Sequence, residues 1–503
     1  MKLTVFLHGV LVITSATAFA GYSVDVRLDK GDGFYKVGEE TVCTATLLKD
    51  GKPAAGEKLR CTVKRERDIL RQDEFLCDGK AVTIRASMDR PGWLFFGFEI
   101  IGPDGNPLQG AGVFKHRMKP TIVGEIGAMY DAHKIKALDS RPADFDAYWA
   151  SCRFKLDQAP LDPKMTEVDV PRALRGKVNC YSVEVKCLGR TPVTGYLAVP
   201  VDARPKNLSQ NRDSHVGRPG KAELPTGSGT GSKDLSQNHP SHVGRPGKAE
   251  LPTGSGTGSK GLPAYVNYQS RVWQDASKKS AMEMASKGVL ALYVSWHGLP
   301  NGTTEEEYKK MSRTWHEEGG KAGDTDRDTW IGHAMYLRAM RALDFIKSRP
   351  EWNQKELVVC GGSLGGIQTI AAAALDPDVT IAVVSVPSGC EYNGYKQGRD
   401  AAGLYRGKPG IARIEADPRL AVTLAYHDGV NFAPRIKGDI YVCTGFADEL
   451  CTPSSVFAFY NALPATTKKF MSTSPSTGHY GTTKNTAGDK RLLDIFRSVT
   501  VYD

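Results

Sequence analysis

The chain has 503 residues, of which 40% are hydrophobic and 24% are charged, and its formal net charge is +10. A chain of this length is longer than the usual domain that folds around a single hydrophobic core, so two or three domains are expected. No basic run is interleaved with aromatic residues, which argues against a nucleic-acid partner. After the first 20 residues, no apolar run approaches the ~20 residues that a membrane span needs, which argues against a membrane protein.

Residues 1–20 have the three parts of a secretory signal peptide. Lys2 gives the positive start, Val5–Ile13 the apolar core, and Ala18-Phe19-Ala20 the small-residue cleavage motif before Gly21. A buried N-terminal strand is the alternative interpretation. The pattern predicts a secreted or periplasmic protein that is cleaved after Ala20.

The ten cysteines are scattered along the chain without a CxxC pair. A zinc ribbon or a thioredoxin-like redox motif is therefore not expected. Export permits disulfides, and one bridge within the set Cys43, Cys61 and Cys77 is one interpretation. Buried free thiols are an equally good one.

Residues 21–117 are predicted to be all-β. Short alternating runs are separated by turn-forming segments such as Lys49–Pro53 and Gly102–Pro107. The expected strands are Tyr22–Leu28, Thr41–Leu47, Lys58–Lys64, Val82–Ser87 and Trp93–Ile100. Strands at this spacing favour an immunoglobulin-like β-sandwich. Such domains serve as sugar-binding modules, lids or spacers, and a spacer is expected here.

Residues 118–503 alternate strands with helices. The expected strands are Tyr181–Gly189, Gly195–Val201, Leu262–Gln269, Gly288–Trp296, Glu356–Ser363, Val379–Val386 and Asp439–Gly445. The expected helices are His333–Ile346 and Gly366–Leu375. This alternation is typical of an α/β fold, with a mostly parallel sheet and helices on both faces.

A tandem duplication interrupts the α/β region at residues 207–260. Asn207–Lys233 and Asp234–Lys260 are two units of 27 residues that differ at three positions. They are rich in Gly, Ser, Pro and Lys, and two such units cannot bury a core. We expect a disordered insertion in the connection before Leu262–Gln269, at the end of the sheet opposite the active site.

The segment Gly361-Gly362-Ser363-Leu364-Gly365 matches G-x-S-x-G, the nucleophile elbow of serine hydrolases. An apolar strand precedes it and an alanine-rich helix follows, as the elbow requires. The sharp turn lifts the serine hydroxyl above the sheet, and small neighbours are needed because the strand and helix backbones pass close together. A structural glycine-rich turn is the alternative. The strand–turn–helix context favours Ser363 as the nucleophile.

Chain order selects the base and the acid, because this fold arranges them as serine, acid and histidine. Asp448 comes shortly after the expected strand Asp439–Gly445, and His479 is the histidine that follows it, in a Ser/Thr/Gly-rich loop. His479 would take the proton of Ser363, and Asp448 would fix the tautomer of the imidazole. Glu449 is the competing acid. Two other acids are expected to be structural: Asp428 and Asp439.

Two backbone N–H groups are expected to hold the oxyanion of the reaction. One belongs to Leu364, the residue after the nucleophile. The other is expected in the loop after Leu262–Gln269, near Ser270 or Arg271, and Arg271 is the preferred donor.

At this point three segments together resemble the acetylxylan esterase / cephalosporin-C deacetylase family, a family-seven carbohydrate esterase. The segments are Asp144–Lys164, His333–Gly366 and Ala425–Leu463. The resemblance covers about residues 130–503 without the duplicated segment, and it does not cover the β-region. It implies an α/β-hydrolase fold, a Ser-Asp-His triad on Ser363, Asp448 and His479, and removal of acetyl groups from acetylated xylo-oligosaccharides and small acetyl esters. It also implies no metal or organic cofactor and a homo-oligomer, since family members often form rings of six subunits.

The sequence departs from the family at two places. The family commonly has a Gly-bearing turn such as His-Gly-Tyr-Gly after the third strand, where this chain has Gln269-Ser270-Arg271-Val272. The N–H of Arg271 can still donate, and its side chain is expected either to clash with the acyl pocket or to reshape it. The residue after the serine is usually Gln and here is Leu364, whose N–H role is kept. Triad chemistry is therefore expected, while substrate preference stays open.

Two classes of function follow from the sequence. The first is a secreted serine carboxylesterase that removes acetyl groups from plant-type polysaccharide fragments. The second is a carbohydrate-surface binding protein with an inactive hydrolase domain. Within the enzymes, a prolyl-peptidase-like hydrolase is the runner-up, although nothing in the sequence resembles a propeller domain.

Overall fold

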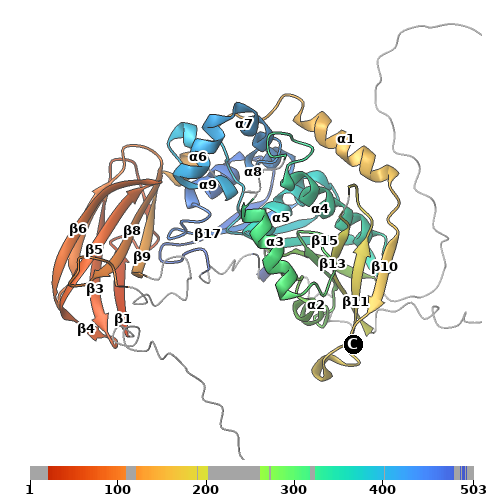
Figure 1. The fold of residues 1–503 in the computed structure, drawn as a ribbon, viewed down its shortest axis with the longest axis horizontal. Helices are drawn as coiled ribbons and strands as arrows, with labels where there is room; N and C mark the ends of the chain where they lie inside the picture. Colours follow the sequence, from red (N-terminus) through yellow and green to blue (C-terminus); the bar gives the residue numbers. More distant parts are fainter. Residues whose placement is uncertain are drawn as a thin grey trace, which may run out of the picture.

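The computed structural model describes residues 21–108, 121–189, 191–201, 261–270, 274–317, 323–400, 403–480, 488, 490–492 and 494. The expected signal peptide at 1–20, the duplicated segment at 207–260 and Arg271 lie outside the described residues. Figure 1 shows an N-terminal unit of strands beside a larger unit of strands and helices. None of the helices in the described part of the chain has both the length and the apolar character to span a bilayer.

The N-terminal unit consists of two antiparallel sheets packed face to face, apart from one short parallel pair between β2 and β9. The first sheet contains β1 (Tyr22–Leu28), β3 (Glu40–Lys49), β4 (Lys52–Pro53) and β7 (Val82–Ser87). The second sheet has the order β2 (Phe34–Tyr35), β9 (Ile122–Tyr130), β8 (Gly92–Ile101), β5 (Ala55–Arg65) and β6 (Asp68–Asp78). The alternating burial along β3 follows from this packing, because every second side chain faces the other sheet. The β-sandwich expected from the sequence is thus the observed architecture.

Strand β9 lies after the boundary expected at residue 117 and pairs with β8 along its length. We therefore propose that the sandwich ends after Tyr130 and that the hydrolase unit begins there. β8 is buried on both of its faces. Phe96 and Phe98 point into the sandwich core, whereas Trp93 and Phe95 belong to the core of the larger unit.

The larger unit is built on a nine-stranded sheet with the order β10-β11-β12-β14-β13-β15-β16-β17-β18. Its strands are β10 (Pro163–Glu167), β11 (Val178–Val185), β12 (Val193–Pro200), β13 (Leu262–Tyr268), β14 (Leu290–Ser295), β15 (Trp352–Gly362), β16 (Ile381–Ser385), β17 (Asp439–Gly445) and β18 (Lys469–Ser474). The six strands from β14 to β18 in this order are parallel, and β10, β11 and β12 add an antiparallel edge. The expected α/β-hydrolase architecture is confirmed.

Helices cover both faces of this sheet, and others pack outside it. The helices of the described residues are α1 (Phe145–Gln158), α2 (Lys278–Ala285), α3 (Glu305–Glu317), α4 (Ile331–Lys347), α5 (Leu364–Leu375), α6 (Gly407–Ala416), α7 (Pro418–Ala425), α8 (Gly429–Phe432) and α9 (Pro453–Ala462). Short 3-10 turns are η1 (Ala132–Lys134), η2 (Arg172–Leu174), η4 (Gly394–Gln397), η5 (Gly403–Tyr405) and η6 (Ala433–Arg435). One core contains residues of α1, α4, α5, α8 and α9, and a second core contains α2 with the opposite side chains of the strands.

All ten cysteines are free thiols, so none of the N-terminal cysteines forms the disulfide that was one of the two interpretations. Cys43, Cys61 and Cys77 are buried in the sandwich core. Burial raises the pKa of the Cys61 thiol to about 12. These side chains act as small hydrophobic residues that fill the core.

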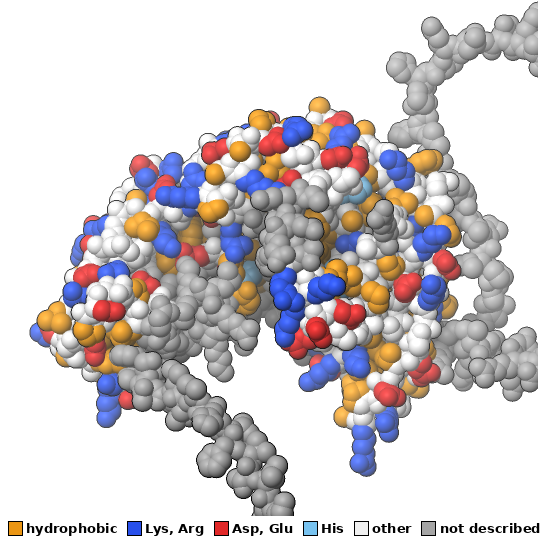
Figure 2. All heavy atoms as spheres, viewed as in Figure 1, with side chains coloured by type: hydrophobic (Ala, Val, Ile, Leu, Met, Phe, Trp, Pro, Cys, Tyr) orange, Lys and Arg blue, Asp and Glu red, His pale blue; other side chains and the backbone are white. Residues whose placement is uncertain are grey.

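Charged side chains of both signs are mixed across the face shown in Figure 2, over the sandwich and the hydrolase unit alike. A single-sign surface that steers a polyanion would look different. The picture is consistent with the solvated surface expected from the composition.

Candidate active site

Ser363 stands in the sharp turn between β15 and α5. Its φ of 52° and ψ of −118° are unusual for a residue with a side chain. The backbone is held there by hydrogen bonds from Ser363 N to Ser385 O, at 2.9 Å, and from Gly366 N to Ser363 O, at 2.9 Å. Strain of this kind is kept only where the surroundings fix it, and it is the backbone that a nucleophile elbow needs.

The glycines around Ser363 are required by close backbone contacts. A Cβ on Gly365 would lie 2.1 Å from the carbonyl oxygen of Tyr268 at the end of β13. A Cβ on Gly361 would lie 2.4 Å from the carbonyl oxygen of Gly365. The G-x-S-x-G pattern therefore reflects the distance at which α5 passes the sheet.

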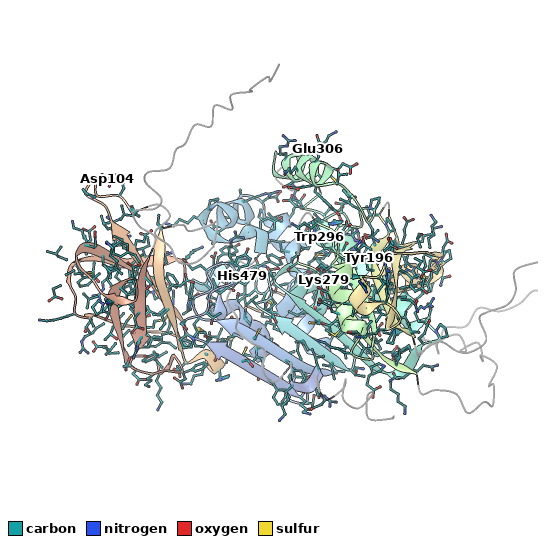
Figure 3. All side chains as sticks on the ribbon, turned by 90° about the horizontal axis from the view of Figure 1, so that it is seen from below. Asp104, Tyr196, Lys279, Trp296, Glu306 and His479 are labelled. Carbon is teal, nitrogen blue, oxygen red and sulfur yellow. The ribbon has the colours of Figure 1, made fainter. Side chains whose placement is uncertain are left out.

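The structure brings Ser363, His479 and Asp448 into one hydrogen-bonded row. His479 Nε2 lies 3.0 Å from Ser363 Oγ, and His479 Nδ1 lies 2.8 Å from Asp448 Oδ2. In Figure 3 His479 lies on the side of the hydrolase unit that faces the sandwich. The three residues follow the carboxyl ends of the parallel strands β15, β17 and β18, which end at the same edge of the sheet, with β16 between β15 and β17.

Asp448 is fully buried, and its second oxygen is also engaged. Oδ1 accepts hydrogen bonds from Leu450 N at 2.8 Å and from Cys451 N at 2.9 Å. An ionised carboxylate only accepts hydrogen bonds, so the proton between the two groups sits on His479 Nδ1. That tautomer leaves Nε2 as an acceptor for the hydroxyl proton of Ser363.

The competing acid has another partner. Glu449 forms an ion pair with Lys64 of the sandwich strand β5 and does not reach His479 in the hydrogen bonds of the described residues. Asp439 begins β17 and pairs with Lys468 at 3.3 Å. Neither side chain is placed to orient the imidazole.

Asp428 is a buried structural acid. It accepts hydrogen bonds from Glu391 N and Tyr392 N, both at 2.6 Å, and caps α8 through Val430 N at 3.0 Å. Burial raises its pKa to about 7. The preceding residue, His427, is fully buried, and burial lowers its pKa to about 3. These residues hold the packing around α8, and no described contact joins them to Ser363.

Leu364 is the first residue of α5, so its N–H has no acceptor within the helix and points out of the helix N-terminus. An oxyanion next to Ser363 Oγ would meet this donor and the positive end of the helix dipole. The second expected donor, Arg271, lies outside the described residues. Its role remains a prediction.

Cys451 was not among the residues expected at the site. Its thiol is buried, and its ligand atom lies within 4.8 Å of those of Asp448 and His479. Burial raises the pKa of this thiol well above its usual value. Such a trio can hold a metal ion in principle, but here Asp448 and His479 are already bound to each other. The sequence had no signal for Cys451, because it is a lone cysteine outside any recognised motif.

A second candidate trio lies among Cys152, Asp328 and His333, between α1 and the start of α4. His333 Nδ1 is 2.7 Å from the hydroxyl of Tyr148, and burial lowers its pKa. This trio shares no residue with the row formed by Ser363, Asp448 and His479.

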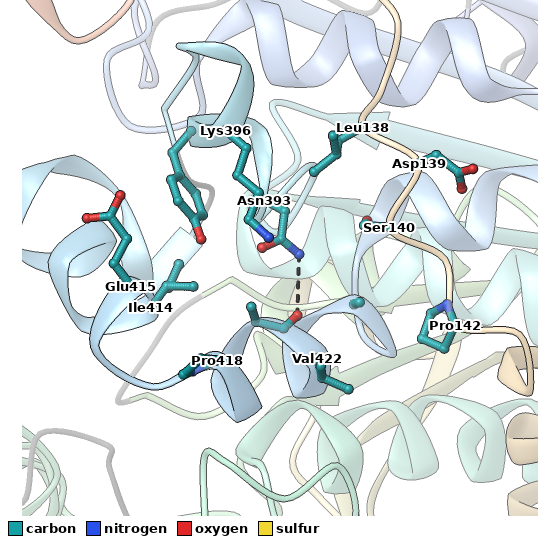
Figure 4. A pocket seen from close by; sticks show the side chains of 13 residues that line it. Leu138, Asp139, Ser140, Pro142, Asn393, Lys396, Ile414, Glu415, Pro418 and Val422 are labelled. Carbon is teal, nitrogen blue, oxygen red and sulfur yellow. Dashed lines mark hydrogen bonds between the residues drawn. The ribbon is translucent and has the colours of Figure 1, made fainter.

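A pocket of about 720 Å³ opens between α6, α7 and the segment that precedes α1 (Figure 4). Leu138, Pro142, Ile414 and Val422 give it apolar walls, and Asn393 donates a hydrogen bond to Ala421 O at 3.3 Å. None of its lining residues belongs to the Ser363–His479–Asp448 row. It is a separate feature of the helical part of the hydrolase unit.

Comparison with known proteins relates the chain to acetyl esterases. Residues 249–490 match the family model described as acetyl xylan esterase. The chain is 25% identical, over 461 residues, to the acetyl esterase Axe7A of Xylanibacter ruminicola, covering 90% of this chain and 86% of that protein.

Two solved structures share the fold of the hydrolase unit. The acetyl xylan esterase from Paenibacillus sp. R4 is 21% identical with a TM-score of 0.52, covering 73% of this chain and 98% of that one. Acetyl xylan esterase 1 from Thermoanaerobacterium sp. JW/SL YS485 is 18% identical with a TM-score of 0.50, covering 73% of this chain and 97% of that one.

Proposed function

We infer that this chain, whose residues 249–490 match the acetyl xylan esterase family model, is a serine carboxylesterase that removes acetyl groups from acetylated xylo-oligosaccharides or similar acetylated sugars. The observation that carries the proposal is the pair of contacts of His479, at 3.0 Å to Ser363 Oγ and 2.8 Å to Asp448 Oδ2. Ester hydrolysis is the chemistry that such a row performs when an acyl oxygen can be stabilised beside it.

The first half-reaction would transfer the acetyl group to the enzyme. Ser363 Oγ attacks the acetyl carbonyl carbon while its proton moves to His479 Nε2. The carbonyl oxygen becomes an oxyanion, held by the N–H of Leu364 and, as we propose, by that of Arg271. As the tetrahedral intermediate collapses, His479 returns the proton to the sugar oxygen. The deacetylated sugar leaves, and Ser363 carries an acetyl ester.

The second half-reaction restores the enzyme. A water molecule gives a proton to His479 Nε2, and its oxygen attacks the acetyl-Ser363 carbonyl carbon. The bond to Ser363 Oγ breaks, His479 returns the proton to Oγ, and acetic acid leaves and gives its proton to solvent as acetate. Asp448 accepts from Nδ1–H throughout and stabilises the imidazolium that forms twice in each cycle.

The contacts among these three side chains argue against a carbohydrate-surface binding protein with an inactive hydrolase domain. In a protein that only binds carbohydrate, the strained backbone at Ser363, with its φ of 52°, would serve no function. The family match likewise does not favour a prolyl-peptidase-like enzyme.

A panel of acetylated xylan, acetylated monosaccharides and cephalosporin C, scored for acetate release, tests the substrate class. A chromogenic acetate ester tests the reaction class, with Ser363→Ala as the control. Hydrolysis of the chromogenic ester at equal background rates by wild type and Ser363→Ala would contradict an esterase. Activity on that ester alone would keep the esterase and contradict the acetylated-sugar assignment.

We further propose that residues 1–20 direct export and are removed before Gly21. N-terminal sequencing of protein recovered from the periplasm or medium of an expressing bacterium tests this, and a mature protein that starts at Met1 would contradict it. A homo-oligomer is also proposed, by analogy with the family, and light scattering after size-exclusion chromatography measures it. A monomer at micromolar concentration would contradict the oligomer.

A further inference from the structure

The five-stranded sheet of the sandwich contacts the loops that carry Asp448 and His479. Trp93, Phe95 and Met129, from β8 and β9, belong to the same buried core as the hydrolase unit. A spacer would touch its neighbour through a solvated surface, as most domains in one chain do. Here the contact is apolar, buried and next to the candidate catalytic residues.

The loop before Asp448 is held by a buried hydrogen bond from the sandwich. Trp93 Nε1 donates to the carbonyl oxygen of Phe446 at 2.6 Å, and both residues are at most 2% exposed. Phe446 lies two residues before Asp448. The ring of Phe446 also meets Phe34 of β2 edge to face, with centroids 5.2 Å apart.

The loop before His479 is held by the same sheet. Gly127 N of β9 donates to Pro475 O at 2.9 Å. Phe446 N donates to Ser474 O at 2.8 Å and so ties the two loops to each other. A Cβ on Gly127 would lie 1.8 Å from Phe446 O, so the sandwich backbone approaches the acid loop as closely as a glycine permits.

The helix that follows the acid loop has a third attachment. Ser454, in the first turn of α9, donates through Oγ to Glu66 Oε2 at 2.7 Å. The other oxygen, Glu66 Oε1, accepts from Trp93 N at 2.9 Å. Glu66 is 2% exposed and has a φ of 53°. The buried carboxyl group of Glu66 thus links α9 to Trp93, the residue that donates to Phe446 O.

A fourth attachment is the ion pair between Lys64 of β5 and Glu449, directly after Asp448. The attachments therefore lie on both sides of Asp448 in the chain. Hydrogen bonds and ion pairs among the described residues thus tie both the segment from 446 to 454 and the His479 loop to the sandwich.

From these contacts we propose that the β-sandwich is part of the catalytic machinery, and that Trp93 and Glu66 are positioning residues for Asp448 and His479. The inference rests on the proposed roles of Ser363, Asp448 and His479. The sandwich does not touch the reacting atoms. It sets the distance between the β17 and β18 loops, and with it the two hydrogen bonds of His479.

The physical reason is that the row tolerates little displacement. Catalytic groups must be held to within about an ångström, and a misplacement of about 1 Å can cost about 100-fold in rate. If Trp93 loses its N–H, the carbonyl of Phe446 is buried without that donor and the loop moves to satisfy it. Asp448 lies two residues further on and shares the shift.

The test compares two tryptophans that make the same type of bond in different places. Trp93→Phe removes the donor to Phe446 O and keeps an aromatic ring. Trp149→Phe is the matched control, because Trp149 Nε1 donates to Tyr426 O at 2.9 Å and is equally buried, in α1. Each variant loses one buried indole hydrogen bond, so similar falls in melting temperature are expected.

Three readouts separate positioning from general stability. We expect Trp93→Phe to lower kcat about 10-fold or more on a chromogenic acetate ester, with KM changed less than about 2-fold. The rate at which a small fluorophosphonate labels Ser363 should fall by a similar factor. The low-field proton resonance of His479 Nδ1–H should shift. Trp149→Phe should leave all three within about 2-fold of wild type or unshifted.

Glu66 gives an independent variant pair in case Trp93→Phe folds poorly. Glu66→Ala removes both acceptors and should lower the labelling rate of Ser363. Glu66→Gln should restore most of it, since the amide oxygen accepts from Trp93 N and the amide N–H donates to the Ser454 hydroxyl. A fall that Gln does not restore would overturn the role given to Glu66.

Equal losses in Trp93→Phe and Trp149→Phe, or no loss in Trp93→Phe, would overturn the positioning role. The labelling readout needs no acetylated sugar. The proposal therefore fails separately from the substrate assignment, and Ser363→Ala, which abolishes labelling, shows whether Ser363 is the reactive serine at all.

Discussion

Ser454 Oγ lies 2.7 Å from Glu66 Oε2, although the two residues are 388 positions apart in the chain. The contact joins the turn between β5 and β6 of the sandwich to α9, the helix that follows the Asp448 loop. Both side chains are buried, so the hydrogen bond is not screened by solvent. A spacer domain would not be expected to make such a buried contact with the hydrolase unit.

Glu66 should make stability depend on pH. Burial raises its pKa from the ordinary value of 4.5 to about 7, with Arg399 lowering it and Glu391 raising it. The folded state then binds more protons than the unfolded state between these two values, so the contribution of Glu66 is largest at low pH and falls as pH rises through about 7. In Glu66→Gln this fall should be absent.

Chemical unfolding of wild type and Glu66→Gln at pH 5, 6, 7 and 8 measures the effect. The difference in unfolding free energy between the two proteins should change by an amount on the order of 3 kcal/mol across the series. Wild type should become less stable relative to Glu66→Gln as pH rises. Parallel profiles for the two proteins would show that Glu66 does not titrate in this range. Asp428, whose pKa is also raised to about 7, cancels in the comparison because both proteins contain it.

Asp448→Asn should lower kcat by about 10⁴-fold, because the amide can donate to Nδ1 and favours the wrong tautomer of His479. Asp439→Asn is the control, since Asp439 is an acid at the start of β17 that pairs with Lys468 and has no contact with His479 among the described hydrogen bonds. It should stay within about 2-fold of wild type. Steady-state kinetics on a chromogenic acetate ester measures both, and similar losses in the two variants would argue against Asp448 as the orienting acid.

Gly365→Ala should destabilise the fold at the elbow. The new Cβ would stand 2.1 Å from Tyr268 O, so either β13 or α5 must move, at a cost of about 3 kcal/mol or more. Gly362→Ala, at the last residue of β15, is the contrast, because its Cβ would lie 3.5 Å from the nearest atom, an ordinary contact. Thermal unfolding should show a clear drop for Gly365→Ala and a small change for Gly362→Ala. Equal melting temperatures would mean that the contact at Gly365 is easily relieved.

Deletion of residues 207–260 should leave esterase activity and melting temperature nearly unchanged. β12 ends at Pro200 and β13 begins at Leu262, so the duplicated segment lies in the connection between two strands. Long insertions in such connections cost little closure entropy. The deletion variant and wild type can be compared by melting temperature and by hydrolysis of an acetate ester. A large loss of either would make the segment a functional element.

The triad candidates were predictable because the elbow ties sequence to geometry. A strand, a glycine-bounded serine and a helix have few alternative arrangements, and chain order then left His479 and either Asp448 or Glu449. The structure separates these two acids by their partners, since Asp448 meets His479 whereas Glu449 meets Lys64. The local sequence Ala447-Asp448-Glu449 does not indicate which of the two acids contacts His479.

The links between the two units were not predictable for a related reason. Trp93, Glu66 and Gly127 look like ordinary residues of a sandwich, and their partners lie more than 340 positions away. The strand β6 was missed because its alternating pattern is broken by polar residues, and it is a mostly exposed edge strand. The sequence changes character near residue 118, before β9 begins, so the boundary after Tyr130 is a proposal from the pairing of β9 with β8.

The shared core of Trp93, Phe95 and Met129 with the hydrolase unit has a consequence for how the molecule comes apart. Two domains joined by a linker melt in two steps, each at its own temperature. Here the unfolding of β8 and β9 would expose core side chains of the larger unit to water. Calorimetry should therefore record a single endotherm. Heat, protease or a destabilising substitution in the sandwich would then silence the esterase at the same moment as it unfolds the N-terminal strands.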